Sequence, residues 1–264
     1  MARLADAITT ARTKPAHTAT IWTFDIERFP MTTYQWGARN RSGYTGEHMV
    51  TEHGRMSSWA AKRHDGIVLY ADEHTHGRAN MIRSLHQVMR TADILVGFNS
   101  INFDLPHCNT EFLLEGLTPP PPVKHIDLMR VIKRRFRLEY NNLGSVTKRL
   151  GIPTKIETGG FDMWRRMMDG DPEAWAANRR YNIQDVHVTD ALRQRLAGWN
   201  TSGPNMGLWM GADRTCWNCA SENLVRDGSS ATNVTRYARY QCGDCGAWNR
   251  DKHRMASVDL RQAL

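Results

Sequence analysis

The sequence lacks any long hydrophobic run, and this absence excludes several classes of protein. No segment approaches the roughly 18 or more continuous apolar residues that a membrane-spanning helix needs. The N-terminus lacks the unbroken apolar stretch of a secretory signal peptide, because Asp6 interrupts it. We therefore expect a cytoplasmic protein. Because the cytoplasm is reducing, its cysteines are expected to be thiols or metal ligands and not disulfides.

Acidic residues are in deficit. Asp and Glu together number 27 against 35 Lys and Arg, which gives a formal net charge of +8 and an isoelectric point near 9.5. A basic surplus of this size favours an anionic partner, most commonly nucleic acid, although a basic protein without such a partner has the same composition. Hydrophobic residues make up 41% of the 264 residues. The chain is therefore long and apolar enough for one medium catalytic domain and a small accessory module.

Patterns of apolar residues divide the chain into segments. Residues 1–18 are polar and predict a flexible arm. The elements expected after it are strands at 18–24, 32–38, 68–71 and 94–98 and helices at 79–92, 127–137, 143–150 and 172–196. Strands that alternate with helices indicate an α/β domain over 19–197, with a mixed sheet flanked by helices. Glycines and a proline mark a linker at 198–212, followed by a cysteine-rich module at 213–250 and a polar tail at 251–264.

The first chemical signal is a pair of carboxylates, Asp25 and Glu27, which follow a strand-forming run. Side chains two residues apart point to the same face of a strand. Two carboxylates held side by side repel each other unless a cation neutralises them, and oxygen ligands suit Mg²⁺ or Mn²⁺. Taken alone, an Asp-x-Glu pair also fits an exposed loop.

A second signal follows the apolar residues 94–98. Asn99 and Asp104 are polar groups among residues that favour burial, such as Phe98 and Phe103. A buried carboxylate needs a partner, which a metal ion would supply. The alternative is an aspartate that caps the helix that follows.

The third signal lies in the helix expected at 172–196. Tyr181 and Asp185 are four residues apart and share one helical face, so the phenol lies one turn from the carboxylate. From there it can hydrogen-bond a water that a metal ion holds. A pair with this spacing is also common on helix surfaces that bind nothing.

Together, the three motifs resemble those of the DEDDy 3′→5′ exonucleases of the ribonuclease-H-like superfamily. They are most similar to the proofreading exonuclease domain of family B DNA polymerases, in the same order, over residues 19–197. The segments that carry the resemblance are Phe24–Glu27, Gly97–Pro106 and Tyr181–Asp185. A related subgroup carries histidine where this chain has Arg180, so the tyrosine variant applies. The unassigned stretch at 40–64 departs from the family pattern and is expected to alter the substrate groove.

The resemblance implies both a site and an activity. It assigns two Mg²⁺ or Mn²⁺ ions to Asp25, Glu27, Asp104 and Asp185, with Tyr181 orienting the attacking water. Such a site would release nucleoside 5′-monophosphates from the 3′ ends of single-stranded nucleic acid, DNA more than RNA. Two ions about 3.5–4 Å apart stabilise both the attacking and the leaving oxygen. The chain is short for a polymerase, so the resemblance implies a free-standing exonuclease of the phage or bacterial type, in the host cytoplasm if phage-encoded.

Contacts to the substrate are expected in two places. The resemblance places Asn99 near the terminal nucleotide and gives Phe103 a packing role. A basic segment with aromatic neighbours, which includes Lys133, Arg134 and Arg135, suits contact with a phosphate backbone. It equally suits the exposed face of a basic helix.

The cysteines are few and grouped. Cys216 and Cys219 form one C-x2-C pair and Cys242 and Cys245 form another, with 22 residues between the pairs, while Cys108 stands alone and is expected to be an inert thiol. Two such pairs present four thiolates to one tetrahedral, structural Zn²⁺. The segment resembles a zinc ribbon, and metal binding is expected to supply its folding energy. Disulfide pairing is the alternative.

The role of the ribbon stays open at this point. The segment Arg236–Tyr240 alternates arginine with tyrosine, and Trp217 and Trp248 flank the cysteine pairs. This composition favours binding of single-stranded nucleic acid by stacking and phosphate contact. It also fits a docking face for a replication or repair protein, or a small aromatic core. Two alternatives to a DNA exonuclease remain: the same catalysis on RNA, and a non-catalytic protein that binds nucleic acid through the ribbon.

Overall fold

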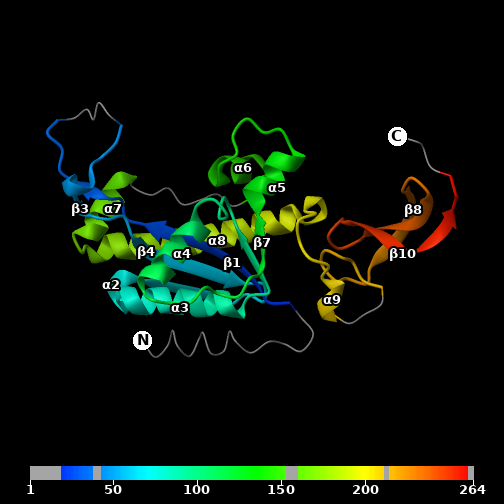
Figure 1. Ribbon diagram of the computed structural model, residues 1–264, viewed down its shortest axis with the longest axis horizontal. Helices are drawn as coiled ribbons and strands as arrows, with labels where there is room; N and C mark the ends of the chain where they lie inside the picture. The colour runs from blue at the N-terminus through cyan, green and yellow to red at the C-terminus, as the bar shows by residue number, and fades with distance from the viewer. Residues whose placement is uncertain (1–18, 38–42, 153–159, 211–213, 261–264) are drawn as a thin grey trace.

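The computed structural model describes residues 19–37, 43–152, 160–210 and 214–260. Its larger part is a five-stranded mixed sheet between layers of helices, and its smaller part is a three-stranded antiparallel sheet next to the cysteines (Figure 1). This confirms the expected α/β class with a mixed sheet flanked by helices. The arm expected at 1–18 lies outside the described residues.

The central sheet has the strand order β5–β4–β1–β6–β7. Its strands are β1 (Ile21–Arg28), β4 (Met56–Arg63), β5 (Val68–Asp72), β6 (Ile94–Gly97) and β7 (Lys124–Asp127). β4 pairs antiparallel with both β1 and β5, whereas β1, β6 and β7 run parallel to one another. The parallel strands therefore end at the same edge of the sheet, and the residues that follow them meet there.

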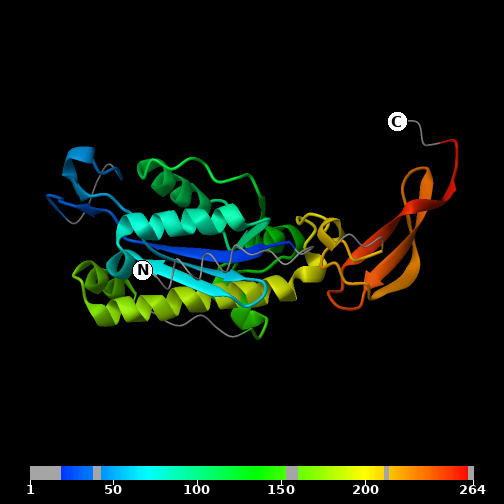
Figure 2. The same cartoon turned by 90° about the horizontal axis from the view of Figure 1, so that it is seen from below.

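Helices cover both faces of this sheet. They are α2 (Glu73–His76), α3 (Arg78–Thr91), α4 (Asp104–Leu114), α5 (Leu128–Arg135), α6 (Leu143–Arg149), α7 (Phe161–Met168) and α8 (Pro172–Arg195). Figure 2 shows the sheet between α3 on one side and α8 on the other. No helix in the described part of the chain has the length and apolar character needed to cross a bilayer.

Alternation along β1 decides what each face of the sheet carries. Trp22, Phe24 and Ile26 belong to the hydrophobic core that α3 covers. The residues between and after them, which include Asp25 and Glu27, point to the opposite face. There α8 packs on β1 and β4. Both acidic residues of the first motif thus face the helix that carries the third.

The stretch at 40–64, which has no assignable sequence pattern, supplies the inner strand β4. By contrast, the strand expected at 32–38 shrinks to β2 (Thr32–Thr33), which pairs with β3 (Val50–Glu52) beside a short 3₁₀ turn, η1 (Glu47–Met49). Aromatic residues suggested a longer strand, but Trp36 is fully exposed. Its side chain therefore does not mark a buried face.

The cysteine-rich module is an antiparallel sheet of order β10–β9–β8. Its strands are β8 (Leu224–Ala231), β9 (Thr235–Cys242) and β10 (Trp248–Ser257). β10 runs past residue 250, where the sequence suggested the start of a tail, because Arg254 and Ser257 still pair with β9. The ribbon sheet therefore extends to Ser257.

A short connection joins the two parts. It contains the 3₁₀ turn η2 (Ala197–Trp199) and helix α9 (Gly207–Met210). The Asn218 side-chain amide donates to the Ala197 carbonyl at 3.0 Å. A Cβ at Gly198 would lie only 2.8 Å from the carbonyl oxygen of Cys245, so glycine permits this close approach. Ile21 and Asn218 line the same cavity of about 280 Å³, which places the ribbon at the N-terminal end of β1.

Candidate functional site

Carboxylates from two elements converge on the α8 face of the sheet. One ligand oxygen each from Asp25, Glu27 and Asp185 lie within 4.8 Å of one another. The first two come from β1 and the third is buried in α8. Carboxylates this close repel each other, and oxygen donors of this kind are the ligands that Mg²⁺ and Mn²⁺ take. The donor set therefore fits a divalent cation.

Asp104 reaches the same strand from another side. It is the first residue of α4, and its Oδ1 accepts the backbone N–H of Ile26 at 3.1 Å. The pairing of β1 with β6 ends at Thr23, so Asp104 takes up a strand N–H beyond that point. Burial raises the pKa of Asp104 to about 7, although backbone hydrogen bonds oppose the shift. Asp104 therefore lies next to the three-carboxylate group without being part of it.

Helix α8 presents Tyr181 and Asp185 from its buried side. Asp171 caps its N-terminus by accepting the backbone N–H groups of the first turn, and Pro172 occupies the first helical position, as the sequence indicates. Several further polar residues share the buried side of this helix: Asn178, Asn182, Thr189 and Asp190. A helix that only covered a core would be apolar there, so this face has another role.

The loop between β6 and α4 is held by Asp127. One carboxylate oxygen accepts the backbone N–H of Asn99 at 3.0 Å, and the other accepts that of Ile101 at 3.3 Å. The same side chain caps α5 by accepting the N–H of Met129 at 3.0 Å. These bonds give Asp127 a structural role. They also help to hold Asn99 at a φ of +60°, in the left-handed region.

Comparison with known proteins identifies the family. A family model described as RNase_H superfamily matches residues 46–197, which is more than half of the chain. The chain belongs to the RNase H superfamily. Family membership and the carboxylate group together support nuclease activity, with nucleic acid as the partner and divalent metal ions as cofactors.

A solved structure shares the fold of this RNase H superfamily member. The family B DNA polymerase from the hyperthermophilic archaeon Pyrobaculum calidifontis matches with a TM-score of 0.51 and 18% sequence identity. The match covers 67% of this chain and 24% of the polymerase chain. The likeness confirms, at the level of the fold, the resemblance that the three motifs indicated. A comparison with curated proteins gives no match.

Two of the expected substrate-binding residues lie at the edge of the sheet where the parallel strands end. Asn99 is the second residue after β6, and Phe103 precedes Asp104 at the start of α4. The Phe103 side chain is 44% exposed, and its ring packs edge-on against His107 with a centroid distance of 4.8 Å. An exposed aromatic ring can stack on a nucleic-acid base.

The other expected substrate-binding residues lie elsewhere. Lys133, Arg134 and Arg135 are exposed in the last turn of α5, at the end of that helix remote from Asp127. Arg135 donates to the hydroxyl of Thr201 at 2.7 Å, in the connection to the ribbon. Arg135 therefore links the last turn of α5 to the connection that leads to the ribbon.

Two further residues contact the site or the loop beside it: Arg130, which belongs to the basic segment expected to contact phosphates, and Asn182, which the sequence did not single out. Arg130, in the first turn of α5, donates to the Asn102 side-chain oxygen at 2.8 Å and so contacts the loop before α4. Asn182 donates to Asp25 Oδ2 at 2.8 Å. The only sequence signal for Asn182 is its polarity on a helix face that faces the sheet.

The second candidate metal site is the group of four cysteines in the ribbon. The sulfurs of Cys216, Cys219, Cys242 and Cys245 lie within 4.8 Å of one another, and all four residues are free thiols. Gly246 has a φ of +72°, which a turn behind the second cysteine pair requires. The arrangement is compatible with one tetrahedral metal ion.

Side-chain amides support this sulfur group. Asn218 lies 3.5 Å from the sulfur of Cys245, and Asn249 lies 3.6 Å from that of Cys216, each with its amide N–H as donor. Donors of this kind orient and stabilise thiolate ligands. Cys108 lies far from them along the chain, in the core under α3, where burial raises the pKa of its thiol. It stays protonated at neutral pH, as an inert thiol does.

Proposed function

We propose that the protein is a metal-dependent 3′→5′ exonuclease that acts on single-stranded nucleic acid, DNA more than RNA, and releases nucleoside 5′-monophosphates. The observation that carries this proposal is the convergence of Asp25, Glu27 and Asp185 on one face of the sheet. Asp104 adjoins the group through Ile26. Tyr181 precedes Asp185 by one helical turn. All five residues match the motif positions of the DEDDy exonucleases.

Asp25, Glu27 and Asp185, together with the adjoining Asp104, would hold two Mg²⁺ or Mn²⁺ ions. Such cations stabilise negative charge on the attacking and leaving oxygens of a phosphodiester and lower the pKa of the attacking water. The chain supplies the remaining tasks. Tyr181 orients the water, the exposed ring of Phe103 stacks on the terminal base, and Asn99 contacts the terminal nucleotide.

The polarity of attack and the choice of DNA rest on the motif resemblance. The alternative hypothesis is that the same catalytic chemistry acts on RNA. Because the catalytic groups act on the phosphate, which both nucleic acids share, they do not separate these alternatives. The distinction depends on how the groove treats the 2′-hydroxyl.

We further propose that the ribbon, held by one Zn²⁺, binds the same single strand. The guanidinium of Arg239 lies 4.5 Å over the ring of Trp248, and that of Arg250 lies 4.5 Å over the ring of Tyr237. Residues two apart share one face of a strand, and β9 and β10 are paired, so the four side chains form one surface. We call these four residues the ribbon face. Arginines next to rings suit phosphates and stacked bases together.

The two tryptophans beside the cysteine pairs have different roles. Trp217 packs on the cysteine group, and its indole N–H donates to the carbonyl of Trp248 at 2.9 Å. Trp248 keeps 45% of its surface exposed. The first therefore supports the small core and the second is available to a ligand. We propose a domain at 19–197, a linker at 198–212 and a ribbon from 213 to the end of β10.

The decisive experiment uses matched oligonucleotides: single-stranded DNA, double-stranded DNA and RNA, each labelled at either the 5′ or the 3′ end. With Mg²⁺ or Mn²⁺, single-stranded DNA is expected to give labelled mononucleotide at once from the 3′ label and a shrinking ladder from the 5′ label. EDTA and Asp25→Ala should each abolish release, and the Asp25→Ala protein should keep its fold. Internal cuts, or mononucleotides released first from the 5′ label, would refute the proposed polarity. Faster digestion of RNA than of DNA would support the alternative hypothesis that RNA is the substrate.

A further inference from the structure

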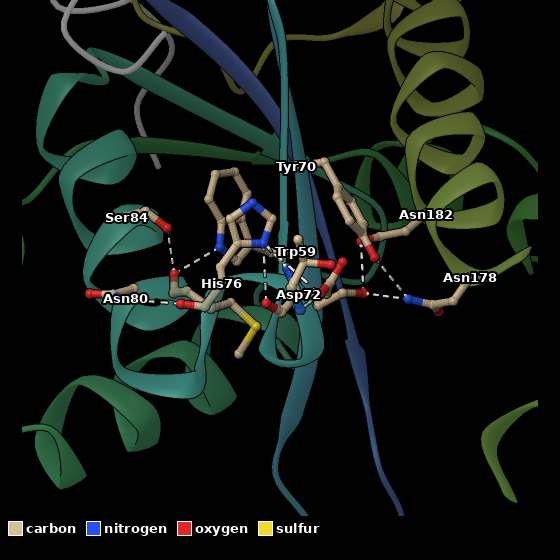
Figure 3. A network of polar contacts seen from close by, with 11 residues as sticks. Trp59, Tyr70, Asp72, His76, Asn80, Ser84, Asn178 and Asn182 are labelled. Atoms are coloured by element: carbon tan, nitrogen blue, oxygen red, sulfur yellow. Dashed lines mark hydrogen bonds and ion pairs between the residues drawn. The ribbon is translucent and has the colours of Figure 1, made fainter. Parts of the chain in front are cut away.

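A chain of hydrogen bonds links β5, β4 and α8 to Asp25 on the central strand β1. The Asn178 amide donates to the hydroxyl of Ser58 at 2.9 Å, and that hydroxyl donates to the Asn182 side-chain oxygen at 3.2 Å. The Asn182 amide then donates to Asp25 Oδ2 at 2.8 Å. Tyr70 stands at the far end, where its hydroxyl oxygen lies 3.3 Å from the Asn178 amide. Figure 3 shows Tyr70, Asn178 and Asn182 together on the side of the sheet that α8 covers.

These residues are buried polar groups contributed by separate strands and one helix. Ser58, Asn178 and Asn182 have essentially no exposed surface, and Tyr70 is buried as well. Burying such groups costs free energy that hydrogen bonds at best recover. The helix is also attached by an ion pair between Lys62 on β4 and Asp190 on α8. Their arrangement around Asp25 therefore points to a further role.

The direction of each bond is fixed along the chain. Ser58 accepts a hydrogen bond from the Asn178 amide, so its single hydroxyl proton is available to the Asn182 oxygen. Because that oxygen is engaged by Ser58, the amide N–H of Asn182 is turned to the carboxylate of Asp25. If the Asn182 amide flipped, two oxygens would face each other at Asp25 and the Ser58 hydroxyl would lose the oxygen that accepts its proton. Asn178 and Ser58 thus hold the amide in one orientation.

We propose that Asn182 is a positioning residue that fixes the Asp25 carboxylate for divalent-cation binding, and that Ser58 and Asn178 keep Asn182 in the orientation this requires. The inference rests on the proposed metal site. A neutral amide suits the task because a hydrogen bond to the charged form favours an ionised carboxylate. A lysine or arginine at position 182 would compete with the cation for the same oxygen. Hydrogen-bonded partners that orient a ligand in this way commonly change metal affinity about 10–100-fold.

The test measures Mn²⁺ affinity by isothermal titration of the zinc-loaded, full-length protein, with no nucleic acid present. Asn182→Leu keeps a similar volume and removes the amide, and it is expected to weaken Mn²⁺ binding about 10–100-fold. Ser58→Ala leaves the amide free to rotate and should give a smaller, several-fold loss. In nuclease assays, both variants should need more Mn²⁺ for half-maximal nucleotide release. Their rate at saturating Mn²⁺ should change less.

The matched control is Lys62→Met, which removes another polar link between β4 and α8. It is expected to lower the melting temperature but to leave Mn²⁺ affinity unchanged. Parental affinity in Asn182→Leu would overturn the inference, as would an equal loss of affinity in Lys62→Met. If Asn182→Leu does not fold, the Ser58→Ala variant provides the test. An unchanged Mn²⁺ affinity in Ser58→Ala would then overturn the inference. A parent protein that binds no Mn²⁺ and releases no nucleotide would instead refute the proposed function itself.

Discussion

The carboxylate of Asp104 accepts the backbone N–H of Ile26 at 3.1 Å, and this bond joins the start of α4 to the strand that carries Asp25 and Glu27. Ile26 itself points into the core under α3. Its N–H lies in the plane of the sheet, so the acceptor must come from the edge of β1. Asp104 therefore has two tasks, since it satisfies a strand N–H and also places a buried acid beside the carboxylate group.

The substitution Asp104→Asn separates these tasks. The amide oxygen can still accept the N–H of Ile26, but the side chain no longer offers an anionic ligand. We expect nucleotide release to fall at least about 100-fold. Thermal unfolding of the metal-free protein should be unchanged or shifted upwards, because a neutral group replaces a buried acid. Circular dichroism melts and end-labelled digestion check both outcomes.

Asp127→Asn is the control for this substitution. It makes the same chemical change at a carboxylate that caps α5 and holds Asn99 and Ile101. Loss of charge-assisted bonds to backbone N–H groups should lower the melting temperature. If Asp104→Asn kept full activity, Asp104 would have no place in the catalytic group.

Tyr181→Phe tests the role of the phenol. Removal of the hydroxyl leaves the ring packed in α8 and should slow single-turnover nucleotide release about 100-fold. Mn²⁺ affinity should not change, because the phenol orients water and is not a metal ligand. Tyr140→Phe is the matched control, since it removes a hydroxyl from an exposed ring. A Tyr181→Phe rate equal to that of the parent would remove this residue from the mechanism.

Much of the site can be predicted from the sequence because its signals are local. Strand alternation puts Asp25 and Glu27 on one face, and helix geometry puts Tyr181 one turn from Asp185. The convergence of Asp25 and Asp185 also follows once α8 is known to cover that face. Asn182 could not be found in this way. Its link to Ser58 joins residues 124 positions apart, and the spacing of polar residues does not show which of them pair.

Strand β4 escapes prediction for a related reason. Its residues on the α8 face include Ser58 and Lys62, which are polar because they contact polar residues of α8. The strand therefore lacks the apolar alternation by which strands are recognised. The strand expected at 32–38 is the opposite case, because a strand was expected where only Thr32 and Thr33 form one. The apolar side chain of Trp36 is exposed there and does not belong to a core. In both cases, whether the segment forms a strand depends on the element that packs against it and not on its composition alone.

The pH dependence of folding should show the burial of His125. Burial lowers the pKa of this imidazole from 6.5 to about 4. Below pH 6.5 His125 takes up a proton in the unfolded chain but stays neutral in the folded protein. The free energy of unfolding therefore decreases as the pH falls from 6.5 towards 4. The difference between these pKa values corresponds to at most about 3 kcal/mol.

This prediction is measured by urea unfolding at pH 7, 5.5 and 4.5, in the parent and in His125→Gln. The variant lacks the titrating ring, so its stability should fall less over this range. Any release of zinc in acid affects both proteins alike, so the difference between them isolates His125. Equal slopes in the two proteins would show that His125 is not held neutral.

Zinc should be required by the ribbon and not by the larger domain. Elemental analysis of protein purified without chelator is expected to find about one zinc per chain. Cys242→Ser, or treatment with a strong chelator, should change the fluorescence of Trp217 and Trp248, while the main melting transition persists. Protein that contains no zinc but has an ordered ribbon would contradict the assignment.

The ribbon face should matter only for long substrates. The ribbon lies at the N-terminal end of β1 near Ile21, and Asp25 is four residues further on, about 13 Å along the strand. A strand with its 3′ end at Asp25 must therefore extend several nucleotides to reach the ribbon. The double substitution Arg239→Ala with Trp248→Ala removes one stacked pair of the ribbon face. At moderate salt this double variant should bind a single-stranded 30-mer about tenfold or more weakly than the parent does. A tetranucleotide should bind to both proteins equally well.

Arg236→Ala is the control for charge, because Arg236 is exposed on the alternate face of β9. It removes one arginine, as the double substitution does, but no stacked pair. Fluorescence anisotropy with both oligonucleotides in Mg²⁺-free buffer separates binding from cleavage. If Arg236→Ala weakened the 30-mer as much as the double substitution, net charge alone would explain the binding. If the double substitution left the 30-mer unaffected, the ribbon face would have to serve a partner other than nucleic acid.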